Sequence, residues 1–244
     1  MTADAAPRAV FFDLYGTLID IRTDEDDPTV YTTLSEFLAY AGVGIAPADL
    51  SREYRARVRA HLAQSGEPFP EVDVAAVFGE IMTEFRRPRS GGADPADVAR
   101  LFRTLTRRRF AAFPGVHDVL TRLRGKYRLG LISDAQWVFT EPELAMTQLD
   151  GYFSVIVLSS RVGVKKPDVR PFAEAMAALE TTPRASLYVG DNPSRDLVGA
   201  RNAGMRCVIF RGRGGDVAYD ALVPDASFEA YSDLESIVDR LLGA

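Results

Sequence analysis

Short apolar segments recur along the chain, and amphipathic stretches separate the later ones. Runs rich in Val, Ile, Leu and Phe without polar alternation are typical of strands buried on both faces. The predicted strands cover residues 9–14, 129–132, 155–158, 187–189 and 207–210. Helical spacing of apolar residues predicts helices over 116–126, 141–149, 171–179 and 195–203. This alternation of strand and helix predicts an α/β fold with a doubly wound parallel sheet.

One interval departs from that alternation. Between Asp20 and Ala112 the pattern predicts several helices and no comparable strand. Asp27 followed by Pro28 is typical of a helix start, and further helices are predicted over 47–63, 72–85 and 94–110. We therefore expect residues 1–20 and 113–244 to form a Rossmann-like core, and residues 21–112 to form a helical cap.

Composition narrows the class of protein. A chain of 244 residues with 47% hydrophobic and 26% charged residues is ordinary for a globular protein. The net charge of −5 argues against nucleic-acid binding through bulk charge. No apolar run approaches the ~20 residues of a membrane span, and residues 1–8 lack the apolar core of an export signal. The single cysteine, Cys207, fits a reducing compartment, so we expect a cytoplasmic protein. These features do not predict the oligomeric state.

Polar side chains follow the predicted strands at the points where they end. Asp13 lies at the end of the first strand, Ser133 follows the second, Lys166 comes shortly after the third, and Asp191 follows the fourth. In open α/β sheets, ligands bind just beyond the carboxyl ends of the strands. We therefore expect these groups to share one crevice that suits a small anionic substrate held together with a metal ion.

The chemistry of these groups favours covalent catalysis. An aspartate can attack an electrophile and divide one difficult step into two easier ones. Mg²⁺ prefers oxygen ligands, often one or two carboxylates together with substrate phosphate and water, and Asp13 and Asp191 offer such ligands. A lysine and hydroxyl donors would then stabilise the charge that develops on the transferring group. Gly16 would permit a sharp turn that returns Thr17 toward the site.

Four segments, in this order, resemble the motifs of the haloacid dehalogenase (HAD) superfamily. Phe-Phe-Asp13-Leu-Tyr15-Gly-Thr17-Leu is similar to its nucleophile loop, and Leu-Ile-Ser133-Asp resembles its second motif. Gly-Val-Lys-Lys166-Pro-Asp resembles the third motif, and Val-Gly-Asp191-Asn-Pro-Ser-Arg-Asp196 resembles the fourth. The predicted cap also resembles the family's helical cap, which lies between the first and second motifs (subfamily I type).

The resemblance implies a role for each matched residue. Asp13 would be the nucleophile, Thr17 and Ser133 would bind the phosphate-like group, and Lys166 would be the lysine of the third motif. Lys166 fits that motif better than Lys165 because it directly precedes Pro167. Mg²⁺ would be bound by Asp13, the backbone carbonyl of Tyr15 and Asp191. Asp196 would support that metal cluster or orient Lys166.

Tyr15 departs from the usual pattern of the family's phosphatases, which carry an aspartate here as general acid and base. A tyrosine, with an ordinary pKa of about 10, can donate a hydrogen bond but is a poor base at neutral pH. General acid–base help is worth roughly 10²–10⁴ in rate, so a phosphatase without it should be slow. Tyrosine at this position is typical of the family's L-2-haloacid dehalogenases, whose halide leaving group needs no proton.

The fourth motif instead favours a metal-dependent phosphatase over a dehalogenase. Dehalogenases of this kind work without metal and have largely neutral residues where this chain has Asp191. Acids beside Asp13 without a cation would repel a carboxylate substrate. The sequence therefore favours Mg²⁺-dependent hydrolysis of a small phosphate monoester through an aspartyl-phosphate. The alternatives are a metal-independent 2-haloacid dehalogenase and a weakly catalytic protein that binds a ligand or partner.

Overall fold

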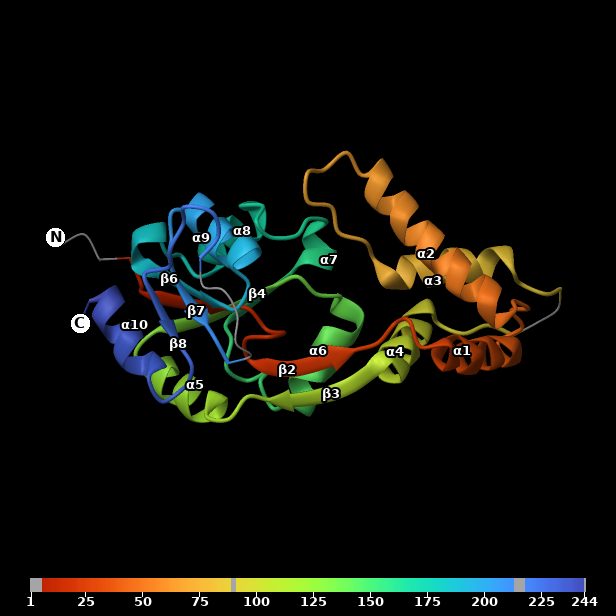
Figure 1. Cartoon of the computed structure of the whole chain (residues 1–244), viewed down its shortest axis with the longest axis horizontal. Coiled ribbons are helices and arrows are strands. Elements are labelled where there is room, and N and C mark those ends of the chain that lie inside the picture. The colour runs from red at the N-terminus through yellow and green to blue at the C-terminus, as the bar shows by residue number, and fades with distance from the viewer. Residues whose placement is uncertain (1–5, 89–90, 213–217, 244) are drawn as a thin grey trace.

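The computed structural model describes residues 6–88, 91–212 and 218–243. The predicted core segments 1–20 and 113–244 therefore include short stretches, 1–5, 213–217 and 244, that lie outside the described residues. In Figure 1 the described chain forms two lobes: one holds the large sheet and both ends of the chain, and the other holds α1 to α3. Within the described ranges, no helix combines the length and the apolar character that crossing a membrane requires.

The larger lobe is built on a six-stranded sheet in the order β5-β4-β1-β6-β7-β8, in which every neighbouring pair is parallel. Its strands are β1 (Ala9–Phe12), β4 (Arg128–Ser133), β5 (Val155–Leu158), β6 (Ser186–Gly190), β7 (Arg206–Phe210) and β8 (Ala226–Phe228). β1 lies between β4 and β6, so the chain winds outward from β1 in both directions. This arrangement confirms the predicted doubly wound parallel sheet, and it makes the carboxyl end of β1 the point where the strand order reverses, beside which ligands bind in such sheets.

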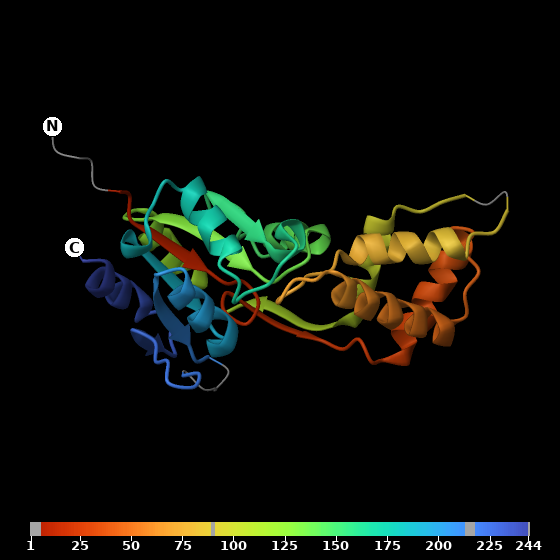
Figure 2. The ribbon, with the colours of Figure 1, turned by 90° about the horizontal axis from the view of Figure 1, so that it is seen from above.

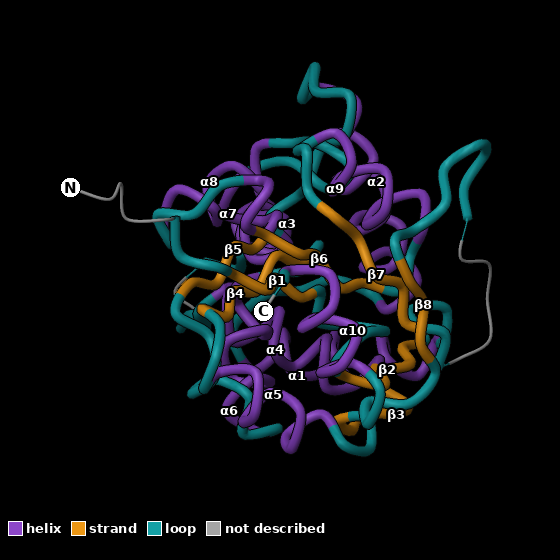
Figure 3. The backbone as a smooth tube through the Cα atoms, turned by 90° about the vertical axis from the view of Figure 1, so that its left-hand side faces the viewer, coloured by secondary structure: helices purple, strands orange, loops and turns teal. Residues whose placement is uncertain are grey.

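Helices cover both faces of this sheet, as Figure 3 shows in a view from the lobe that carries the chain ends. Alternate residues of β1 explain why, because Val10 and Phe12 face one layer while Ala9 and Phe11 face the other. The first layer holds α5 (Val116–Arg124), α6 (Trp137–Met146) and α10 (Leu234–Leu242). The second holds α8 (Arg170–Ala178) and α9 (Val198–Asn202). Apolar residues on both faces therefore keep β1 fully buried.

The second lobe is a bundle with its own apolar centre (Figure 2). Its helices are α1 (Pro28–Tyr40), α2 (Pro47–Gln64), α3 (Val74–Glu84) and α4 (Pro95–Thr106). Asp27 caps α1 by accepting a hydrogen bond from the Thr29 backbone, as the Asp-Pro pair predicts. Rings of Tyr54, Phe78 and Phe102 pack together at its centre, with centroids 4.8–5.5 Å apart. We refer to α1–α4 as the helical insert.

Two strands join the lobes, and they correct the prediction of an interval without strands. β2 (Ile19–Thr23) pairs antiparallel with β3 (Arg107–Ala112). The helix predicted over 94–110 therefore ends at Thr106, where β3 takes over. β3 begins with three arginines and is largely exposed, so it lacks the apolar run that indicates a buried strand. Its stability comes from pairing with β2, a contact between residues about 90 positions apart that local patterns do not show.

Shorter elements complete the larger lobe. α7 (Ser159–Val162) follows β5 directly, and a single 3₁₀ turn (Pro183–Ala185) precedes β6. The predicted helix over 195–203 consists of two parts, a π-helical segment (Pro193–Leu197) and α9. π-Helical turns are rare and are frequent at functional sites. This one begins two residues after Asp191 and contains Asp196, and both are predicted site residues.

Candidate active site

Asp13 lies at the carboxyl end of the central strand, where the predicted strand ends converge. Its carboxylate is almost completely buried. Oδ1 accepts a hydrogen bond of 2.7 Å from the Ser133 hydroxyl and lies 3.0 Å from Nζ of Lys166. Ser133, 120 positions away in the sequence, reaches this carboxylate because it ends β4, the parallel neighbour of β1. Lys166 reaches it from the segment that follows β5 and α7.

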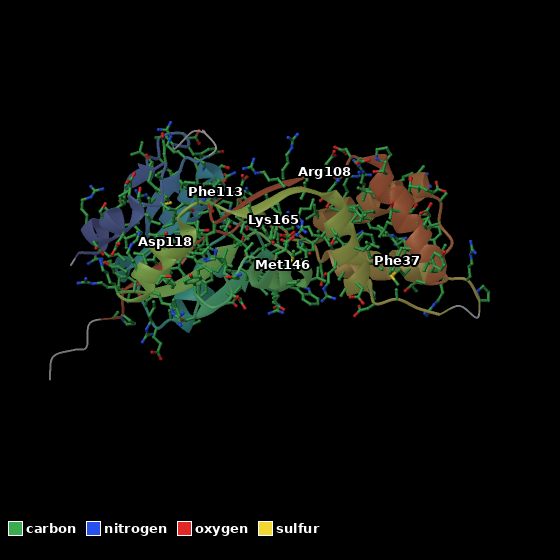
Figure 4. The ribbon with its side chains drawn as sticks, turned by 90° about the horizontal axis from the view of Figure 1, so that it is seen from below. Phe37, Arg108, Phe113, Asp118, Met146 and Lys165 are labelled. Atoms are coloured by element: carbon green, nitrogen blue, oxygen red, sulfur yellow. The ribbon has the colours of Figure 1, made fainter. Side chains whose placement is uncertain are left out.

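Lys166 contacts the nucleophile candidate, and Lys165 does not. The Lys166 side chain is 2% exposed and lies between Asp13 and Asp196, whereas Lys165 is 36% exposed and reaches Glu71. Figure 4 shows Lys165 near the middle of the molecule, close to where the two lobes meet. Although burial by itself lowers it, the carboxylates of Asp13 and Asp196 raise the pKa of Lys166 above its usual range. The ammonium is therefore charged at neutral pH.

Asp196 is fully buried and uses both carboxylate oxygens. Oδ1 lies 2.6 Å from Nζ of Lys166, and Oδ2 accepts backbone hydrogen bonds from Asp191 and Asn192 at 3.0 and 2.8 Å. Tyr188, in the middle of β6, also accepts a hydrogen bond of 2.8 Å from Lys166. These contacts favour the second of the two roles predicted for Asp196, the orientation of Lys166. Tyr188 had no sequence signal beyond its place in an apolar strand.

Thr17 and Asp191 are hydrogen-bonded to each other. The Thr17 hydroxyl donates a hydrogen bond of 2.9 Å to Oδ1 of Asp191; Thr17 directly follows Gly16 in the loop after β1, and Asp191 directly follows β6. Gly16 adopts a φ of +90°, and a Cβ placed there would lie 2.4 Å from Oδ2 of Asp191. Glycine is therefore required both by the backbone conformation and by the close approach of Asp191.

Three carboxylates crowd together at this point. One oxygen from each of Asp13, Asp191 and Asp196 lies within 4.8 Å of the others. Burial, together with the charges of Asp13 and Asp196, raises the pKa of Asp191 to about 7. Burial also raises the pKa of Asp13, against the opposing effect of Lys166. Lys166 forms ion pairs with the two buried acids, while Asp191 is half-buried, so one positive charge faces three acids. The oxygen-rich donor set therefore fits a hard cation such as Mg²⁺.

Comparison with known proteins agrees with this geometry. The profile of the haloacid dehalogenase-like hydrolases matches residues 10–210, which include every predicted site residue. The chain belongs to this family of hydrolases. The match runs from β1 to the end of β7, so it covers the helical insert as well as most of the sheet.

Curated relatives of this HAD hydrolase are named as phosphatases. A phosphoglycolate phosphatase of Nitrosospira multiformis is 28% identical over 232 residues, covering 89% of this chain and 91% of that protein. A phosphoserine phosphatase of Thermus thermophilus is 35% identical over 60% of this chain and 56% of its own length. A glyceraldehyde 3-phosphate phosphatase of Pyrococcus abyssi is 37% identical over 40% of this chain and 42% of its own length. The last two matches thus span only part of each relative.

Solved structures share the whole fold. A 2-haloacid dehalogenase from Pseudomonas syringae pv. Tomato has a TM-score of 0.64 at 24% identity, covering 96% of this chain and 99% of that one. A HAD phosphatase from Thermococcus onnurineus has a TM-score of 0.61 at 21% identity, covering 95% of this chain and 97% of that one. At these identities the likeness establishes the fold alone. It does not distinguish a phosphatase from a dehalogenase.

The Tyr15 side chain of this HAD hydrolase forms its hydrogen bonds with α6. Its hydroxyl donates a short hydrogen bond to Glu143 and lies 3.2 Å from the Thr140 hydroxyl. Burial, together with the charge of Glu143, raises the pKa of Tyr15 well above its usual range. The phenol therefore stays protonated at neutral pH, as expected for a residue that cannot serve as a base. Glu143 and its partner Arg103 had no motif in the sequence that would single them out.

Proposed function

We propose that this protein is a Mg²⁺-dependent phosphohydrolase that hydrolyses a small phosphate monoester with Asp13 as nucleophile. The observation that carries the proposal is the cluster of three carboxylates, two buried and one half-buried, of which the two buried ones form ion pairs with Lys166. This arrangement suits a site that binds a cation and a phosphoryl group together, because an uncompensated group of buried acids is costly. The phosphatase names of the curated relatives support the same reading.

In the first step, Asp13 attacks the phosphorus atom, and the bond from phosphorus to the leaving-group oxygen breaks. Because Tyr15 donates its proton to Glu143 in a hydrogen bond, the leaving-group oxygen takes its proton from solvent in this proposal. Lys166 and Ser133 already contact the Asp13 carboxylate, so they are placed to stabilise charge on the transferring group. Thr17 is placed to donate a hydrogen bond to a phosphoryl oxygen once its hydrogen bond to Asp191 breaks. In the second step, water attacks the phosphorus of the aspartyl-phosphate and gives up a proton to solvent, and the bond from phosphorus to the Asp13 oxygen breaks, which releases phosphate and regenerates Asp13.

The metal ligands in this proposal are the carboxylates of Asp13 and Asp191 and the backbone carbonyl of Tyr15. When bound, Mg²⁺ would offset the negative charge shared by the acids and the phosphoryl group. Asp196 contributes to the cluster through its charge, while its own oxygens hold Lys166 and the backbone of residues 191 and 192. We assign the small anionic substrate to the region between the two lobes and the protein to the cytoplasm.

The experiment compares wild-type protein with Asp13→Asn on a panel of phosphate monoesters with Mg²⁺. We expect the wild type to release phosphate and the variant to lose activity by roughly 10⁴-fold or more, because the covalent route is removed. Release that survives Asp13→Asn would contradict the proposal. If the wild type shows no turnover while inorganic phosphate still binds and raises its melting temperature, the protein is a weakly catalytic binding protein instead.

A second candidate, a metal-independent 2-haloacid dehalogenase, is favoured by one observation. Tyr15 replaces the acid–base residue, and its hydroxyl already donates to Glu143, so the site suits a leaving group that needs no proton. The three neighbouring acids count against it, because a haloacid brings its own negative charge. Halide release from 2-haloacids that persists in EDTA would establish this candidate over the phosphatase.

A further inference from the structure

A second charge cluster is centred on the buried carboxylate of Glu143, which is the hydrogen-bond partner of the Tyr15 hydroxyl. This residue of α6 is 2% exposed, and its carboxylate accepts hydrogen bonds of 2.8 and 3.0 Å from Arg103. It also accepts a hydrogen bond from the Tyr15 hydroxyl, and Nη1 of Arg107 lies 3.6 Å from its Oε1. We call Tyr15, Arg103 and Glu143 the clamp.

The clamp joins three separate parts of the chain. Tyr15 belongs to the loop after β1, Glu143 to a helix that packs on the sheet, and Arg103 to α4 of the helical insert. α4 and α6 pack against each other, and Val138 of α6 belongs to the apolar centre of the insert. Figures 1 and 2 show α6 and α4 where the two lobes meet. The insert thus contacts the loop after the nucleophile directly, in addition to its covalent link through β2 and β3.

The geometry at Arg103 is specific to a guanidinium group. Two of its nitrogens, Nε and Nη2, donate to the two oxygens of Glu143, and its Cζ lies over the rings of Tyr15 and Phe139, 5.0 and 4.6 Å from the ring centroids. A paired interaction of this kind fixes direction as well as distance. The ammonium of a lysine would retain the charge and lose the fixed direction.

The loop that carries Tyr15 is short and internally bonded. Backbone hydrogen bonds of 2.8 Å run from Gly16 to Ile19 and from Leu18 to Leu14. Because these bonds tie the loop together, we expect a displacement of Tyr15 to displace Asp13 as well, which lies two residues away. Misplacing a reacting group by about 1 Å can cost 10²-fold in rate.

We propose that Arg103 and Glu143 are positioning residues: through Tyr15 they hold the nucleophile loop in its reactive geometry while the helical insert is docked on the sheet. The inference rests on the proposed function, since it assigns the clamp to the same Asp13-centred reaction. Neither residue contacts the substrate in this proposal. The effect of the clamp therefore falls on kcat and leaves KM nearly unchanged.

The test separates positioning from simple stability. Arg103→Ala leaves Glu143 buried without its main partner, so we expect a lower melting temperature and a kcat reduced by roughly 10²-fold, with KM within about a factor of 2. Adding Glu143→Gln removes the stranded charge, so the double variant should recover melting temperature but not kcat. Arg103→Lys should recover part of kcat. The matched control is Arg57→Ala, which removes an arginine of the same insert that pairs with Glu84; its kcat should equal that of the wild type.

A purely structural role would give a different pattern. If kcat returns together with melting temperature in the double variant, or if KM rises while kcat stays constant, the inference is wrong although the proposed function stands. Wild-type protein without phosphatase activity would instead overturn the proposed function. Hydrogen exchange then tests the clamp by itself: the amides of residues 14–18 should exchange faster in the double variant than in wild type, and equal exchange would overturn the inference.

Discussion

Two charge clusters contact the loop that follows β1, and they differ in how their charges balance. At the strand ends, the carboxylates of Asp13, Asp191 and Asp196 lie close together, and the ammonium of Lys166 forms ion pairs with Asp13 and Asp196. In the clamp, the one carboxylate of Glu143 pairs with the guanidinium group of Arg103, and Arg107 lies 3.6 Å away. The acid of the clamp is thus compensated by its own partner, whereas the strand-end cluster has an excess of acid.

This difference separates binding from positioning. Burying ions is costly unless partners of opposite charge compensate for the lost water. A cluster that compensates itself has no need of a ligand, so it serves to fix the geometry of the parts that it joins. In a cluster with excess negative charge, the acids repel one another, and a bound cation offsets that repulsion. In our proposal the strand-end cluster is therefore the binding site, and the clamp holds the loop beside it in place.

Removing the cation from each cluster gives the largest expected effects. Lys166→Met leaves Asp13 and Asp196 without their buried partner, so we expect kcat to fall by at least about 10³-fold and stability to fall by roughly 3–5 kcal/mol. Steady-state kinetics and urea unfolding measure the two effects. Arg103→Met, the matched change in the clamp, should cost less activity. If Arg103→Met lowered kcat more than Lys166→Met, the assignment of binding to the strand-end cluster and of positioning to the clamp would be wrong.

Asp191→Asn removes one acid from the overcharged cluster. We expect the dependence on Mg²⁺ to weaken, with kcat at saturating Mg²⁺ reduced by about 10²-fold because the charge on the transferring group is less well compensated. A Mg²⁺ titration of activity and of melting temperature measures both consequences. An unchanged titration curve would exclude Asp191 as a metal ligand.

Gly190→Ala tests how closely the strand-end cluster is packed. A Cβ at residue 190 would lie 2.4 Å from the carboxyl carbon of Asp196, which is fully buried and bonded on both oxygens. We expect a loss of about 1–3 kcal/mol in unfolding free energy, since overpacking has no room to relax here. The control is Gly151→Ala, where nothing lies within 4 Å, and its stability should stay within about 0.5 kcal/mol of wild type. Equal stabilities of the two variants would argue against this packing.

The excess acid should also appear in the pH dependence of the metal-free protein. Burial raises the pKa of Asp191 to about 7 from an ordinary value near 4. A raised pKa in the folded state means that the stability linked to this group is present at low pH and is lost as the pH rises toward 7. The wild-type melting temperature should therefore fall between pH 5 and pH 8 by a few degrees more than that of Asp191→Asn. If the melting temperatures of the two proteins change with pH in parallel, the titration of Asp191 is not the cause of the pH dependence.

The sequence indicates part of the strand-end cluster, because Asp13 and Asp191 directly follow buried strands and Ser133 ends one. Asp13, Ser133 and Asp191 are recognised by position alone, since parallel strands bring their carboxyl ends to one edge of the sheet. The same reasoning identifies the doubly wound fold. The role of Asp196 was predicted from the family resemblance, which left two possibilities, support of the metal cluster or orientation of Lys166. The hydrogen bonds of its carboxylate favour the second.

The clamp had no comparable signal. Glu143 and Arg103 lie within helices, 40 residues apart, where a charged residue usually indicates a solvated face. Only packing of α4 on α6 turns both side chains inward. β3 was missed for a related reason: its run of arginines looks like the exposed end of a helix, and its strand form depends on distant pairing with β2. The local spacing of apolar and polar residues does not indicate contacts between elements that are far apart in the sequence.

The most direct test of the account is a side-by-side assay of phosphate and halide release, on phosphate monoesters and 2-haloacids, with Mg²⁺ and with EDTA. The acid-rich cluster predicts phosphate release that requires Mg²⁺ and no halide release under either condition. Halide release that is indifferent to EDTA, with no phosphate released, would contradict it.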